Sequence, residues 1–186
     1  MTRVIRGSLS TEPRPPPDPV ATLDPARAYD PACRVNPPLP SREDALALLA
    51  GVEDGIVDAI ATDHAPHPPQ RKAVEFACAS PGLIGLETAL SLGLAAVDAG
   101  RLSLHRLLAA LGARPAALIA EARTLAIGAG ADLVVFDPSG RWRPEAESLA
   151  SASANTPLLG RELPGVVRLT VTDGRITYRD GLASGT

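Results

Sequence analysis

The stretch Ile56-Val57-Asp58-Ala59-Ile60-Ala61-Thr62, followed by Asp63-His64-Ala65-Pro66-His67-Pro68-Pro69, decides the fold. Its first seven residues are short and mostly apolar, which predicts a buried parallel strand. Two histidines, an aspartate and three prolines cannot continue a strand, so a loop begins at the strand's C-terminal end. In α/β proteins that end faces the ligand site.

Helical periodicity lies on both sides of this strand. Ser41 is a good N-cap for a helix that ends near Gly51. A second helix is predicted over about 83–99, Ser103 caps a third, and Pro115 begins one more short helical turn. The alternation of helix and strand predicts an α/β architecture.

After about Thr124 the apolar period changes to two. Residues 131–136 are typical of a strand, and 166–171 and 175–178 flank Asp173-Gly174, a two-residue hairpin signal. We therefore predict a β-rich tail over 123–186, after an α/β piece over 29–122. Residues 1–28 are predicted to be an irregular Pro-rich segment.

Composition excludes several classes of protein. The net charge is −3 and no basic stripe is present, which argues against nucleic acid as a partner. No stretch is long and apolar enough to span a membrane, and no secretory signal is visible. Cys33 and Cys78 stand alone, as expected of reduced thiols in a cytoplasmic protein.

Asp63 and His67 are the candidate functional residues of the loop. A carboxylate at a strand end can ligate a metal or accept a proton from metal-bound water, and His67 can donate to an anionic substrate. The alternative is that Asp63 caps a loop and the histidines are ordinary surface residues. The full string Thr62–His67 favours the functional interpretation.

Three segments together resemble the dihydroorotases of the amidohydrolase superfamily. They are Thr62–His67, Tyr29-Asp30-Pro31 with 34–39 (Arg-Val-Asn-Pro-Pro-Leu), and 80–90, which begins Ser-Pro-Gly-Leu-Ile-Gly-Leu-Glu-Thr. The tail strings at 130–137 and 155–157 fit as well, so the resemblance covers about 29–181. It implies the C-terminal part of a metal-dependent hydrolase β/α (TIM-like) barrel, with its last two strands near 34–36 and 56–62, followed by a small β-sandwich.

The resemblance also implies roles for single residues. Asp63 would be a zinc ligand and the general base, and His67 would bind the carboxylate of dihydroorotate. Asn36 would hydrogen-bond the substrate ring, and the backbone of Pro81 and Gly82 would line its other side. The reaction would be the reversible opening of dihydroorotate to N-carbamoyl-aspartate, with zinc as cofactor.

The chain departs from the family at the metal site. It has no His-x-His pair, and Asp63 alone matches an expected ligand. We interpret His105 as a partly buried structural residue and Lys72 as a solvated surface residue. Pro40 stands where the family has an arginine. In place of a Pro-His-His string, 14–19 are Pro-rich, and an out-of-frame, non-native 1–28 is one hypothesis.

Three interpretations remain open at this point. The first is a zinc-dependent cyclic amide hydrolase, inactive as this chain alone, with dihydroorotase favoured over allantoinase or hydantoinase. The second is a non-catalytic dihydroorotase-like partner, for example of a transcarbamoylase, or a homo-oligomer. The third is a gene fragment without a function of its own.

Overall fold

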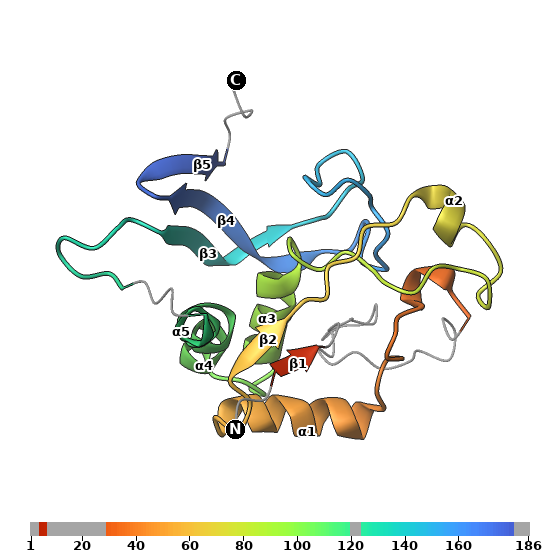
Figure 1. Cartoon of the computed structure of the whole chain (residues 1–186), viewed down its shortest axis with the longest axis horizontal. Coiled ribbons are helices and arrows are strands. Elements are labelled where there is room, and N and C mark those ends of the chain that lie inside the picture. Colours follow the sequence, from red (N-terminus) through yellow and green to blue (C-terminus); the bar gives the residue numbers. More distant parts are fainter. Residues whose placement is uncertain (1–3, 7–28, 120–123, 181–186) are drawn as a thin grey trace.

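The computed structural model describes residues 4–6, 29–119 and 124–180 (Figure 1). Strand β2 (Ala59–Ala61) lies within the predicted range and pairs in parallel with β1 (Val4–Arg6), with Val4 opposite Ala59. The prediction of an irregular segment is therefore wrong for residues 4–6. Val4 and Ile5 are β-branched, and the main-chain groups of β2 offer them a parallel partner. The Pro-rich run 12–19 lies outside the described residues.

The strand predicted near Arg34–Asn36 is absent. The 3-10 helix η2 (Pro31–Cys33) precedes it, with Asp30 as N-cap, and 34–36 are irregular. The two prolines that follow have no N–H to donate to a neighbouring strand. Instead of a strand ladder, the main chain here makes isolated contacts, such as the hydrogen bond from Gly82 N to Arg34 O at 2.9 Å.

Helix α1 (Arg42–Glu53) begins as predicted, because Ser41 Oγ accepts from Asp44 N. It runs past Gly51 to Glu53. The residue that turns the chain away is Gly55, whose φ of 74° lies in the left-handed region. Glu53 then ties this helix to the one that begins at Leu104, because its carboxylate accepts from Ser103 N at 2.7 Å.

The helix predicted over about 83–99 is shorter than expected, because α3 spans only Ala89–Asp98. The short helix α2 (Pro69–Lys72) was not predicted. Residues 83–88 are not helical, because Leu83 forms a parallel bridge with His64. Ser103 caps α4 (Leu104–Leu108) as predicted, and the chain continues through the π-helical turn η3 (Ala109–Ala113) into α5 (Arg114–Leu118), which has Pro115 in its first turn.

The main core joins α1, α3, α4 and η3, and Ile60 of β2 packs against it. Its buried side chains are aliphatic, as the low aromatic content requires: Ala45, Leu49, Val52, Val57, Leu94, Ala96, Leu102, Leu107 and Ala110. A second, smaller cluster brings Leu92 of α3 against Leu158 and Leu163. Helix α3 thus faces both clusters, and in Figure 1 it lies between α1 and the C-terminal sheet.

The tail is a three-stranded antiparallel sheet in the order β3 (Leu133–Trp142), β4 (Leu163–Thr172), β5 (Arg175–Arg179). The predicted hairpin is confirmed, because Asp173 and Gly174 join β4 to β5 with positive φ angles of 50° and 74°. No helix among the described residues is long and apolar enough to cross a membrane.

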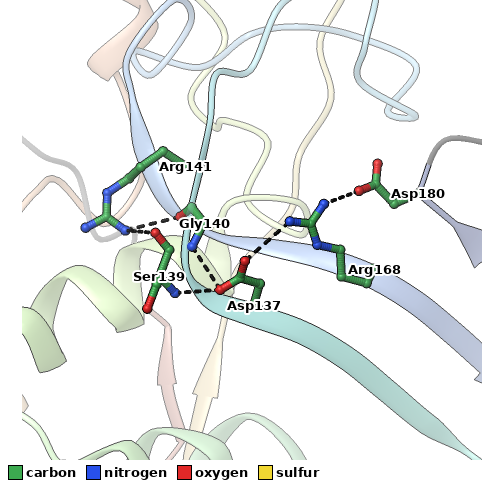
Figure 2. A network of polar contacts seen from close by, with 6 residues as sticks. All are labelled: Asp137, Ser139, Gly140, Arg141, Arg168 and Asp180. Atoms are coloured by element: carbon green, nitrogen blue, oxygen red, sulfur yellow. Dashed lines mark hydrogen bonds and ion pairs between the residues drawn. The ribbon is translucent and has the colours of Figure 1, made fainter.

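Asp137 organises an irregularity in the β3–β4 ladder (Figure 2). Its Oδ1 accepts from Ser139 N at 3.0 Å and Gly140 N at 3.1 Å, and its Oδ2 lies 3.3 Å from Arg168 Nη2. Arg168 also pairs with Asp180. The Ser139 N–H and then Arg168 lower the pKa of Asp137, while the two carboxylates raise the pKa of Arg168.

Candidate functional site

Asp63 stands two residues beyond the end of β2, and its side chain is exposed. Its φ of 48° lies in the left-handed region, where aspartate and asparagine are tolerated better than most residues. Its carboxylate makes no hydrogen bond with any other described side chain or main-chain group. Asp63 is therefore accessible to a ligand from solvent.

His67 contacts the loop at Pro81 and Gly82. Its Nε2 lies 3.1 Å from Pro81 O, so the ring donates its Nε2–H to that carbonyl. Gly82 has a φ of 131°, and a Cβ there would lie 2.7 Å from Ala65 Cβ and 3.0 Å from His67 Nε2. Three of the residues singled out in the sequence thus lie together, and only glycine fits at position 82.

Asn155 connects the two loops, and sequence reasoning assigned it no role. Its Oδ1 accepts from His67 N at 3.0 Å, and its Nδ2 donates to Ala65 O at 2.9 Å and Gly82 O at 3.2 Å. Only 9% of the residue is exposed. All the polar groups of this amide are engaged within the chain, so it holds the site rather than facing a ligand.

Lys72 is buried, at 8% exposure, and the expectation of a solvated surface residue is wrong. Its Nζ donates to Ser80 O and Gly82 O, each at 3.0 Å, and to Arg34 O at 3.3 Å. Burial lowers the pKa of the ammonium. The three carbonyls give it the polar partners that a buried cation requires.

Arg34 fixes the far side of the same loop. Its guanidinium donates to Phe76 O at 3.1 Å and to Ala77 O at 2.6 Å, and also to the carbonyl of Ala79. Asn36, two residues on, is exposed and makes no hydrogen bond with a described residue. The structure thus brings the segment before Asn36 to the loop but leaves the Asn36 side chain in solvent.

The other histidines have structural or no contacts. His64 Nδ1 accepts from Gly85 N at 3.2 Å and Leu86 N at 3.3 Å, so it caps the main chain ahead of α3. His105 is exposed, and the expectation of a partly buried role is wrong. It lies on the solvent side of α4, whose buried residue is Leu107.

Within 4–6, 29–119 and 124–180, no three His, Cys, Asp or Glu side chains form a group that could hold a metal ion. Neither Cys33 nor Cys78 forms a disulfide. A hollow of about 540 Å³ between α5 and the ends of β3 and β4 contains none of the predicted site residues.

Comparison with known proteins finds relatives that match most of this chain. A dihydroorotase from Geobacter sp. (strain M21) is 45% identical over 161 residues, which is 86% of this chain and 38% of that protein. A dihydroorotase from Mycobacterium tuberculosis is 44% identical over 165 residues, again 86% and 38%. The chain therefore spans about 38% of the length of these curated relatives. No family model matches it.

Solved structures show the same partial coverage. An L-hydantoinase (dihydropyrimidinase) from Arthrobacter aurescens superposes with a TM-score of 0.79 at 31% identity, covering 87% of this chain and 38% of that one. A D-hydantoinase (dihydropyrimidinase) from Thermus sp. gives 0.74 at 26% identity, covering 84% and 36%. The described helices and the small antiparallel sheet correspond to a portion of this fold.

Proposed function

The chain is a homologue of the dihydroorotases, and we propose that it carries the substrate-side part of a cyclic amide hydrolase site of that family. The substrate would be dihydroorotate, opened reversibly to N-carbamoyl-aspartate in the cytoplasm. In this proposal 29–122 are the end of a β/α barrel and 123–186 belong to its β-sandwich. The remaining ligands would come from protein outside this chain, which makes a second chain or a homo-oligomer the natural partner.

The contact between His67 and the Pro81–Gly82 loop carries the proposal. Because Nε2–H is donated to Pro81 O, the nitrogen left for a ligand is Nδ1. Nδ1 donates to a carboxylate only when the ring is protonated on both nitrogens. An imidazolium held by Pro81 O would then give the dihydroorotate carboxylate a charge-assisted hydrogen bond.

Asp63 is proposed as the general base. Its exposed carboxylate can take a proton from the attacking water and deliver it to the leaving ring nitrogen. A catalytic zinc site has three protein ligands, and the described residues offer no such group. These residues do not fit a complete zinc site.

Titration of the chain with dihydroorotate, followed by NMR, tests the substrate assignment. We expect the amides around His67 and Gly82 to shift, and His67→Ala to remove the response. His105→Ala, which alters an exposed histidine far along the chain, is the matched control and should bind like the parent. Absence of any response in the parent chain would favour a non-catalytic partner, such as one for a transcarbamoylase.

Zinc content and turnover test the catalytic assignment. We expect the purified chain to hold little zinc and to leave dihydroorotate intact, because one carboxylate is too few ligands. In a complete enzyme containing this sequence, Asp63→Asn should abolish turnover. Near-stoichiometric zinc together with turnover by this chain alone would contradict the proposal.

A second candidate is a hydantoinase-type activity, favoured by the similarity to the L-hydantoinase at 31% identity. Both substrates are cyclic amides, but a hydantoin need not carry a carboxylate for His67. Competition between hydantoin and dihydroorotate in the same titration separates the two.

A further inference from the structure

Lys72 is the only lysine of the chain, and it lies beneath the loop assigned to the substrate. Its ammonium bonds three carbonyls that come from two separate segments, Arg34 and the run Ser80–Gly82. An ammonium has three N–H groups, so this set uses all of them. No donor remains for a ligand.

The carbonyls belong to the two segments that flank the proposed substrate. Arg34 lies two residues before Asn36, and Gly82 itself is a proposed substrate contact. A direct main-chain bond, Gly82 N to Arg34 O at 2.9 Å, joins the same two segments. Arg34 O therefore accepts from both Gly82 N and Lys72 Nζ, while Gly82 O accepts from both Lys72 and Asn155.

We propose that Lys72 is a positioning residue, whose buried ammonium fixes the Pro81–Gly82 loop against the Arg34–Asn36 segment and so sets the width of the substrate site. This rests on the proposed function. The ammonium touches no position assigned to the reacting atoms, so it acts through the main chain of Gly82. A compact point donor suits three converging carbonyls, whereas the planar guanidinium of Arg34 instead serves the carbonyls of 76–79.

Amine labelling of the parent chain tests the burial of Lys72 without any substitution. With one lysine, an amine-reactive reagent has a single side-chain target besides the N-terminal amine, so mass spectrometry follows it directly. We expect Lys72 to react at least about tenfold more slowly in the native chain than in denaturant, because its donors are engaged and shielded. Equal rates would overturn the proposal.

The positioning role is tested with Lys72→Met and the control Arg71→Met. Arg71 is the neighbour on α2, with an exposed side chain. In Lys72→Met we expect amide exchange of Gly82 to rise about tenfold or more, which corresponds to the free energy of one buried hydrogen bond. Exchange of the β4–β5 amides should stay unchanged. Unchanged exchange at Gly82 would overturn the role, as would an equal rise in the hairpin, which would mean a general loss of stability.

Dihydroorotate binding separates the two proposals. We expect Lys72→Met to weaken dihydroorotate binding about tenfold relative to Arg71→Met, which again corresponds to the free energy of one hydrogen bond. Equal affinities of the two variants would refute positioning of the substrate site. If the parent chain binds no dihydroorotate while Gly82 exchange responds as expected, the proposed function fails and the fixing of the loop by Lys72 stands.

Discussion

The loop at 63–67, which carries Asp63 and His67, and the hairpin of β4 and β5 are stabilised by different kinds of interaction. The loop has one bridge pair, His64 with Leu83, and otherwise depends on side chains that reach main-chain groups. His67 N and its acceptor on Asn155 are 88 residues apart. The hairpin is a ladder between adjacent strands closed by a two-residue turn.

The difference shows where each region is vulnerable. A ladder distributes its stability over many main-chain bonds, so one side chain matters little. In the loop, one amide and one ammonium each satisfy three main-chain groups. Removal of the amide leaves His67 N and Ala65 O without that partner, and removal of the ammonium does the same to Ser80 O. Each buried group left unpaired costs about 1–3 kcal/mol.

Asn155→Ala should give the largest effect. It removes the side-chain partner of His67 N and Ala65 O, whereas Gly82 O keeps Lys72, and we expect a loss of about 4 kcal/mol in the free energy of unfolding. Urea denaturation measures it, with Glu147→Ala as an exposed control in the same stretch of chain. A loss under about 1 kcal/mol would show that water replaces the amide and that the loop is not held in this way.

Gly82→Ala against Gly174→Ala compares the same change in both regions. Both glycines have positive φ, but a Cβ at 82 meets Ala65 and His67, whereas nothing lies within 4 Å of one at 174. We expect about 3 kcal/mol at 82, from strain plus the contact, and about 1 kcal/mol at 174 from strain alone. Thermal melts of the two variants measure these losses of stability. Equal losses would show that the contact of the Cβ at position 82 contributes nothing.

Acid should produce the smallest effect, and within the sheet this effect should depend on Asp137. The pKa of Asp137 is lowered in the folded chain, so its stabilising contribution is present above the ordinary carboxyl range and is lost as pH falls below about 4. The group is exposed, so the shift in melting temperature should be slight. Asp137→Asn should lose this pH dependence, while Glu147→Gln keeps it. A parent-like acid response in Asp137→Asn would assign it to another carboxylate.

The sequence predicted the elements that depend on neighbours in the chain. Ser41 and Ser103 cap their helices, and Asp173-Gly174 closes its hairpin, because capping and turn chemistry act within a few residues. Helix α3 begins late because Leu83 pairs with His64, a contact across the fold.

The structural roles of Lys72 and Asn155 at the site were not predicted, because they too depend on contacts across the fold. Lys72 was expected in solvent, since lysine is mostly exposed, and only three distant carbonyls account for its burial. Asn155 stood in a string noted only for its resemblance to a tail region. A single lysine in a chain that otherwise uses arginine was the one available signal.

The backbone conformation at Asp63 restricts which residues fit at this position, independently of any reaction. Its φ of 48° suits aspartate, asparagine or glycine and penalises other side chains by about 1–2 kcal/mol. Even if position 63 took part in no reaction, this backbone conformation would still favour one of these three. Along a lineage, persistence of aspartate over asparagine would therefore support the proposed chemistry, while the absence of bulkier residues would reflect only the turn.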